Sequence, residues 1–227
     1  MRLGNLIIGD IRFQWRYGFY FIYLILALLY VCALGAMPND FKNHIAAIMI
    51  YSDPAAMGLF FMGAIVLLEK SQKVLNAIAI SPVKVSEYIL SKTVALMLIS
   101  CVVAVVLGLA SGTFNFVPII GGTAITSAIF TMLGIIAATR IASLNQFLFV
   151  ILPIELICFV PPIANLFVEL PQGFRFFPFM ACMNLITGSS QSFIFDLLLV
   201  LLTVAVLYWV AFKQVSKMWR SIGGAKL

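Results

Sequence analysis

Long apolar runs alternate with short polar intervals along most of this chain. The apolar runs cover residues 18–37, 54–68, 93–112, 117–138, 147–167 and 193–212. A helix of about 20 apolar residues is long enough to cross the hydrocarbon core of a bilayer. The pattern therefore predicts an all-α integral membrane protein with six transmembrane helices. We expect one domain over 1–227, with a six-span bundle at 18–212 and a tail at 213–227.

The first 17 residues follow a different pattern, in which polar positions recur every three or four residues. The resulting polar stripe consists of Arg2, Asn5, Gly9, Arg12 and Arg16. A helix with one basic face and one apolar face is suited to the surface of an anionic membrane leaflet. We therefore expect an N-terminal amphipathic interfacial helix over 1–17 that contacts membrane lipid. Asp10 and Gln14 fall on its apolar side, which predicts that they face another protein segment.

The longest polar interval inside the apolar region is residues 69–92, which we call the elbow. It contains four lysines and two glutamates, and short loops rich in Lys and Arg lie on the cytoplasmic side of membrane proteins. Val74, Leu75 and Ile78 recur at helical spacing and predict a short helix with one apolar face. This apolar stripe lies outside the lipid, so we expect it to contact another protein.

The elbow is also expected to open the third span. Ser81 followed by Pro82 predicts an N-cap and the first position of a second helix.

The elbow resembles the corresponding segment of permease subunits of type-2 ABC exporters, including drug and fluoroquinolone export permeases. The residues that carry the resemblance are Glu69-Lys70, Leu75, Ser81-Pro82, Glu87-Tyr88 and Lys92. The resemblance implies that the short helix is a cytoplasmic coupling helix between spans two and three. It assigns contact with a separate ATPase to this segment; the candidate residues are Glu69, Lys70, Val74, Leu75, Ile78, Ser81, Pro82 and Glu87.

The distribution of charge predicts the topology. The chain has 14 Lys and Arg against 8 Asp and Glu, and every basic residue except Lys42 and Arg175 falls on the predicted cytoplasmic side. Both termini are therefore expected in the cytoplasm of a bacterial or archaeal cell, below the inner membrane. The net charge of +6 is explained by loops beside spans, so we expect no nucleic-acid partner.

Two regions depart from simple spans. The run 147–167 contains Pro153, Pro161 and Pro162, which predict a kinked or broken helix. Residues 169–190 are apolar and aromatic but too interrupted to span. We expect a re-entrant or interfacial segment on the outer side, before span six.

The sequence contains no set of residues that would make the chain an enzyme. His44 is its only histidine, the four cysteines lack metal-site spacing, and no phosphate-binding Gly-rich motif precedes a Lys-Ser or Lys-Thr pair. We therefore expect no catalytic, metal or cofactor site in this chain. If ATP drives transport, a separate ATPase must bind the ATP and Mg.

Two acids, Glu155 and Asp196, fall inside predicted spans. An ionised carboxylate in the membrane costs about 2.5–3.5 kcal/mol or more, so such residues usually face a cavity or a polar partner. Both are candidates for a substrate path, as contacts for a cationic or zwitterionic compound or as a proton site. The structural alternatives are a protonated Glu155 bonded across helices and an Asp196 that stays hydrated near the outer surface.

Three functions remain open. The favoured one is a permease subunit of an ATP-driven exporter of a hydrophobic or amphipathic, drug-like or lipid-like compound. It would act as a dimer, expected to be a homodimer, with two copies of the ATPase. The second is an ion-coupled secondary transporter subunit that uses Glu155 and Asp196. The third is a membrane assembly or anchoring protein. The elbow favours the first, while the substrate stays open, as does the choice between homodimer and heterodimer.

Overall fold

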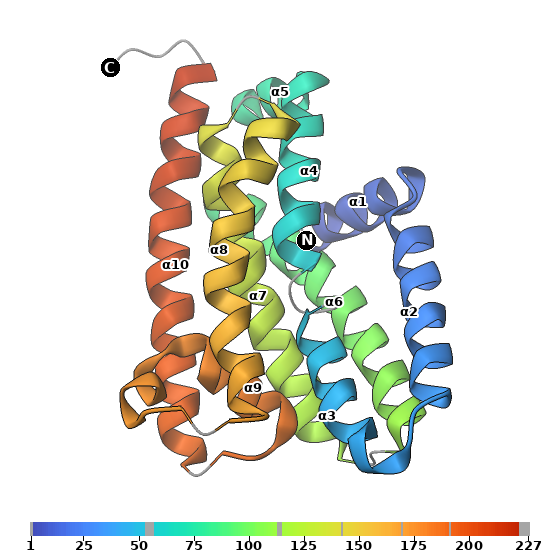
Figure 1. Cartoon of the computed structure of the whole chain (residues 1–227). Helices are drawn as coiled ribbons and strands as arrows, with labels where there is room; N and C mark the ends of the chain where they lie inside the picture. Colours follow the sequence, from blue (N-terminus) through green and yellow to red (C-terminus); the bar gives the residue numbers. More distant parts are fainter. Residues whose placement is uncertain are drawn as a thin grey trace.

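In the computed structural model, residues 2–52, 57–112, 115–141, 143–168, 170–190 and 192–222 are described. Their regular structure is entirely helical, which confirms the all-α prediction (Figure 1). The helices are α1 (Arg2–Arg16), α2 (Phe19–Gly35), α3 (Asn39–Ile50), α4 (Met57–Ser71), α5 (Val74–Ile80), α6 (Val85–Ser111), α7 (Phe116–Arg140), α8 (Leu144–Asn165), the 3-10 helix η2 (Gln172–Phe176), α9 (Pro178–Thr187) and α10 (Phe193–Ile222).

The lengths of these helices establish a multi-pass membrane protein. Helices α6, α7, α8 and α10 are each long and apolar enough to cross a membrane. Helices α1 and α2 are bent by 68° relative to each other, and only together are they long and apolar enough to cross a membrane. The turn between them contains Gly18 with a φ of 77°, a left-handed conformation that glycine adopts without a steric penalty.

Four helices qualify alone as spans, and the α1–α2 pair would be a fifth, so the six-span arrangement stays a prediction. Helix α4 has 15 residues, fewer than a full span needs. Figure 1 shows α3 and α4 one after the other, running from the end of the bundle near α9 toward the end near α5. Residues 53–56, where span two was expected to begin, lie outside the described residues.

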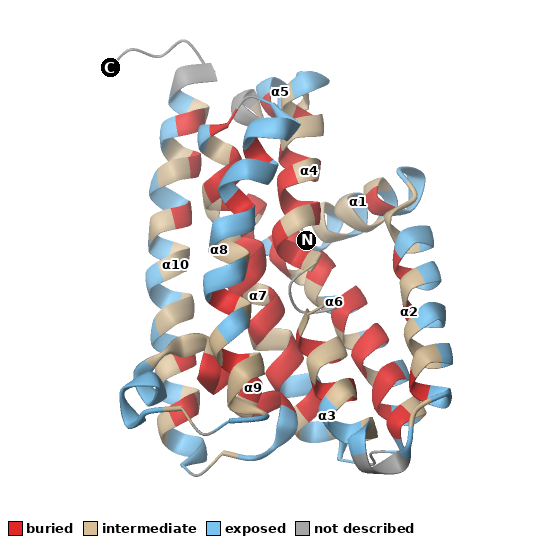
Figure 2. Ribbon diagram, in the orientation of Figure 1, coloured by how far each residue is buried: buried red, intermediate tan, exposed pale blue. Residues whose placement is uncertain are grey.

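The core of the bundle is formed by α4, α6, α7 and α9, while α2, α8 and α10 expose broad apolar faces (Figure 2). Helices α4 and α7 approach closely through two glycines. A Cβ atom on Gly134 would lie 2.7 Å from the backbone oxygen of Leu59, and one on Gly58 would lie 2.7 Å from the Thr131 hydroxyl. Small residues at such crossings let helix backbones pack closely within the membrane.

Helix α8 continues unbroken through Pro153, Pro161 and Pro162, so of the predicted kink or break the break does not occur. A proline at position 162 removes the N–H that would bond to the carbonyl of Cys158 one turn earlier. The hydroxyl of Tyr51, a fully buried residue just after α3, donates a hydrogen bond to this carbonyl at 2.9 Å. A neighbouring segment therefore satisfies the backbone group that the proline leaves free.

The segment before α10 is not a span, as predicted. It contains η2 and the ten-residue α9, whose apolar side chains are mostly buried against the bundle. Glu169, at the start of the predicted segment, lies outside the described residues. Helix α10 continues to Ile222, so the start of the predicted tail is helical, whereas 223–227 with Lys226 are not described.

Candidate functional site

A buried ion network joins three helices at the end of α4. The Nζ atom of Lys92 on α6 lies 2.6 Å from a carboxylate oxygen of Glu69 on α4. The same Nζ atom lies 2.7 Å from a carboxylate oxygen of Asp10 on α1. The side chains of Lys92 and Glu69 are only 3% and 4% exposed. One ammonium group therefore ties α1 to the elbow ends of α4 and α6.

The second oxygen of Glu69 is also satisfied. The hydroxyl of Tyr88 donates a hydrogen bond to it at 2.8 Å. Tyr88 and Lys92 are four residues apart, so they lie on the same face of α6 and reach the same carboxylate. A buried carboxylate is tolerated when charged and hydrogen-bonding partners surround it in this way.

The network extends to α10 through aromatic contacts. The Lys92 ammonium lies 4.9 Å from the centroid of the Tyr88 ring. The ring of Trp219 on α10 meets the Tyr88 ring edge-on, with 5.6 Å between centroids. Cation–π and edge-to-face contacts both favour these arrangements. The aromatic rings of Tyr88 and Trp219 therefore pack beside the polar cluster.

The prediction that Asp10 and Gln14 face protein is confirmed. Asp10 pairs with Lys92, and Gln14 is 2% exposed. The rest of α1 keeps its predicted amphipathic pattern, because the arginines of the polar stripe are exposed. The two residues that broke the sequence pattern therefore lie on the side of α1 that packs against the bundle.

Lys70 leaves α4 in a different direction from its neighbour Glu69. Its Nζ atom donates hydrogen bonds to the carbonyls of Ala138 at 2.6 Å, Thr139 at 3.3 Å and Ile141 at 2.9 Å. These carbonyls lie at the C-terminal end of α7, where no backbone N–H of the helix is left to bond to them. A positive charge is favoured at this end of a helix. Partial burial lowers the pKa of the Lys70 ammonium from its ordinary value. Two consecutive residues thus attach α4 to both α6 and α7.

The short helix predicted in the elbow is present as α5, but its apolar stripe is not free. Leu75 is completely buried in the core, and Ile78 packs against the same cluster. Helix α5 contacts α4 and α10, which cover this side of it. The expectation that Leu75 is available to a partner protein is therefore wrong. The side of α5 that stays exposed carries Asn76 and Ala77.

The start of α6 also differs from the sequence prediction. Helix α6 begins at Val85, and the N–H of its N-cap residue, Lys84, donates to the Glu87 carboxylate at 2.8 Å. Ser81 instead ends α5, where its hydroxyl donates to the carbonyl of Ile78 at 2.7 Å. The assignment of Ser81 as N-cap is wrong because Glu87 lies three residues beyond Lys84 and satisfies that end. Pro82 is exposed in the intervening turn.

The two acids in the predicted spans have different surroundings. Glu155 is half-buried on α8 next to the exposed Leu156, and no hydrogen bond or ion pair of its carboxylate is found within the described part of the chain. Asp196 is 4% exposed in the first turn of α10, and the Asn184 amide of α9 donates to it at 3.4 Å. The alternative of a hydrated Asp196 is therefore wrong. No described contact brings the two carboxylates together.

Comparison with known proteins places the chain in a family. The sequence profile of the fluoroquinolones export permease protein family matches residues 1–220. The chain belongs to this family. The resemblance to type-2 ABC exporter permeases is thereby confirmed. Two similar proteins from Mycobacterium tuberculosis, strains CDC 1551/Oshkosh and ATCC 25618/H37Rv, are each named fluoroquinolones export permease protein. Each is 26% identical over 159 residues, which cover 69% of this chain and 67% of the relative.

In this permease, sequence reasoning left three members of the buried network without a role, Tyr88, Lys92 and Trp219. For Lys92 a signal was present, since a lysine four residues after Tyr88 shares its helix face and needs a partner when buried. Trp219 carried no such signal, because it comes from the far end of the sequence. Among the described residues, no three His, Cys, Asp or Glu side chains are grouped to hold a metal ion.

Proposed function

We propose that this permease is the membrane subunit of an ATP-driven exporter that moves a hydrophobic or amphipathic drug-like compound out of the cytoplasm. The buried network around Glu69 and Lys92 is the observation that carries the proposal. A protein driven by a separate ATPase needs its contact segment rigidly attached to the transmembrane helices. The network and the Lys70 contacts attach the segment next to α5 in this way.

The partner would be a separate ABC ATPase, present in two copies beneath a permease dimer, with ATP and Mg bound by the ATPase. Helix α5 would seat in a cleft of each ATPase through its exposed side, which carries Asn76 and Ala77. Lys73 and Lys84, both exposed beside this helix, add positive charge for acidic groups of the partner. The protein would lie in the inner membrane of a bacterium or archaeon. The basic residues of the elbow and of both termini support a cytoplasmic location for these segments.

In the proposed mechanism, closure of the two ATPases on ATP displaces α5. Glu69 passes the displacement to α6 through Lys92, and Lys70 passes it to the end of α7. Asp10 takes α1 along with α6, so the interfacial helix follows the bundle. Helices α4, α6 and α7 move as rigid units. Their motion opens the opposite end of the bundle, where the compound leaves.

The substrate proposal rests on the two relatives, which are named for fluoroquinolone export. A fluoroquinolone is therefore the compound to test first. Glu155, half-buried and without a described partner, is the candidate contact for a positively charged group on such a compound.

A second candidate function is supported by Asp196. A carboxylate that is 4% exposed and accepts one long hydrogen bond suits a group that exchanges a proton. On this alternative the chain is part of an ion-coupled transporter, and transport needs a proton gradient but no ATPase.

Transport in proteoliposomes distinguishes the two. The tagged permease is purified from its native host together with any ABC ATPase, identified by mass, and reconstituted. Our proposal predicts fluoroquinolone transport that requires hydrolysable ATP and persists without a proton gradient. Transport by permease alone, driven by an imposed proton gradient and indifferent to ATP, would establish the alternative instead.

A further inference from the structure

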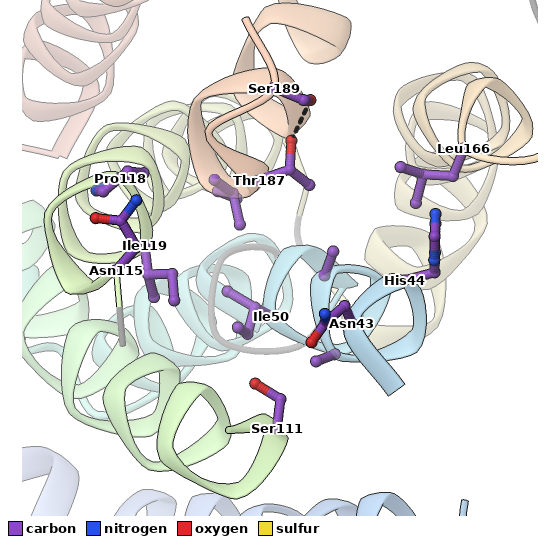
Figure 3. A pocket seen from close by; sticks show the side chains of 13 residues that line it. Asn43, His44, Ile50, Ser111, Asn115, Pro118, Ile119, Leu166, Thr187 and Ser189 are labelled. Atoms are coloured by element: carbon purple, nitrogen blue, oxygen red, sulfur yellow. Dashed lines mark hydrogen bonds between the residues drawn. The ribbon is translucent and has the colours of Figure 1, made fainter. Parts of the chain in front are cut away.

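A pocket of about 270 Å³ opens between helices at the end of the bundle opposite α5 (Figure 3). Segments far apart in the sequence form its walls: α3, the end of α6, the start of α7, and the end of α9 with the turn after it. Leu166, just after α8, and His44 of α3 also line it (Figure 3). The pocket is separate from the buried network at the other end.

The lining has an apolar floor and a polar rim. The floor consists of buried side chains from three helices, Ala46, Ala47, Ile50, Ile119 and Ile186. The rim consists of exposed polar side chains, Asn43, His44, Asn115, Thr187 and Ser189. Small-molecule sites combine these two features, because apolar walls supply affinity and a few polar groups fix orientation. No Asp, Glu, Lys or Arg is among the described lining residues.

Two contacts hold opposite walls of the pocket in place. The α3 wall is anchored by Tyr51, which bonds to the Cys158 carbonyl and packs edge-on against the ring of Phe130. The α9 wall is anchored at Gly122 of α7, where a Cβ atom would lie 2.7 Å from the backbone nitrogen of Ile186. The cavity is therefore formed before any ligand arrives, as most ligand sites are.

We propose that this pocket binds the ring system of a small amphipathic compound that is neutral or zwitterionic overall. The absence of charged lining residues disfavours an ion or a strongly charged molecule, since nothing described there would compensate its lost hydration. Its volume lies just below the range of about 300–1,000 Å³ for ligand sites, so the pocket is too small for a two-chain lipid. Polar groups on one edge of the ring would bond to Asn43, Asn115 or Thr187.

The occupant we commit to is the exported compound itself, so this inference rests on the proposed function. The pocket would then be a site on the outer side of the permease, reached at the end of the export path. It lies within one chain, so a single permease would bind the compound without its ATPase.

The test measures binding of a fluoroquinolone to purified permease in lipid nanodiscs, without ATPase, by equilibrium dialysis. The variant Ala47→Leu fills the floor and should weaken binding at least tenfold. The matched control is Ala36→Leu, the same exchange at an exposed site beyond α2 at the same end of the bundle. It should bind like the parent protein. Asn43→Ala removes an exposed rim amide and should weaken binding several-fold without changing the thermal unfolding midpoint.

Unchanged binding by a folded Ala47→Leu protein, or no binding by the parent protein, would overturn the pocket assignment. If Ala47→Leu does not fold, unchanged binding by Asn43→Ala would also overturn it. ATP-dependent transport in proteoliposomes is read separately. Normal transport together with unaffected binding by both variants refutes the pocket and leaves the proposed function standing. Absence of ATP-dependent transport refutes the proposed function, whatever the binding result.

Discussion

The ammonium of Lys92 lies 2.6 Å from the carboxylate of Glu69, and both residues are buried. This pair connects the last turn of α4 to the second turn of α6, on either side of α5. Because the same ammonium also binds Asp10, the position of α1 depends on it. In the proposed coupling mechanism, this pair is therefore the contact that links α4, α6 and α1.

Removing the ammonium should destabilise the permease more than removing its outer partner. Lys92→Met leaves two carboxylates close together without a cation, a change that typically costs about 3–5 kcal/mol. Asp10→Asn should cost less, because its side chain is 17% exposed and Glu69 remains paired. Thermal unfolding in detergent measures both. An Asp10→Asn loss equal to that of Lys92→Met would contradict this order.

The double variant Asp10→Asn with Lys92→Met checks the pairing itself. Once Lys92 is gone, the Asp10 carboxylate has lost its partner, so neutralising it should recover stability. Additive losses would mean that the two residues do not interact.

The Tyr51 hydrogen bond should matter only because residue 162 is proline. Tyr51→Phe keeps the ring and leaves the Cys158 carbonyl without a donor, with an expected loss of about 1–3 kcal/mol. In a Pro162→Ala background the helix regains its own N–H, so the same Tyr51→Phe exchange should cost close to nothing. Unfolding midpoints of the four proteins of this cycle test the claim. An equal Tyr51→Phe loss in both backgrounds would refute it.

Two glycines of α7 give a matched pair for the helix crossing. Gly134→Ala places a Cβ 2.7 Å from the Leu59 carbonyl oxygen of α4, and overpacking of this kind costs about 1–3 kcal/mol. Gly121→Ala meets no atom within 4 Å, and it should be neutral or stabilising because alanine favours helix. Equal stability of both variants would contradict the close α4–α7 approach.

The sequence predicted what depends on local pattern. Apolar runs predicted the helices, and the misfit of Asp10 within its stripe predicted a buried partner. What failed depends on residues distant in the chain. The apolar stripe at Leu75 has the same sequence pattern whether its partner is an ATPase or another helix of the same chain. Here the partners include α10, which begins more than 100 residues later. The prolines of α8 suggested a kink or a break, and the Tyr51 hydroxyl that compensates Pro162 could not be foreseen because it comes from a distant segment.

The same reasoning applies to the sites. The elbow could be located from its charge, but the partners of Lys92 could not be chosen from spacing alone. The pocket could not be predicted at all, because segments distant in the sequence form it and His44 had no local signal of a role.

Topology is tested by labelling single cysteines in a cysteine-free background. Lys84→Cys, in the exposed turn before α6, should react with an impermeant maleimide only after the cells are opened. Ser189→Cys, exposed at the opposite end, should react in intact cells. Labelling of Lys84→Cys from outside intact cells would reverse the orientation and remove α5 from reach of any ATPase.

The central claim, that the exposed side of α5 binds the ATPase, is tested most directly by Ala77→Arg. Ala77 is exposed within α5, and arginine is a good helix former, so the permease should stay folded. Leu75→Asp cannot serve, because it would bury a carboxylate in the core and unfold the elbow. The control Ala36→Arg introduces the same charge at an exposed site at the far end of the bundle.

The decisive measurement is the amount of ABC ATPase, identified by mass, that co-purifies with each folded permease. The account predicts at least a tenfold loss for Ala77→Arg, an equal loss of ATP-dependent fluoroquinolone transport, and no change for Ala36→Arg. A normal amount of bound ATPase with normal transport in Ala77→Arg would contradict the claim that α5 is the coupling contact.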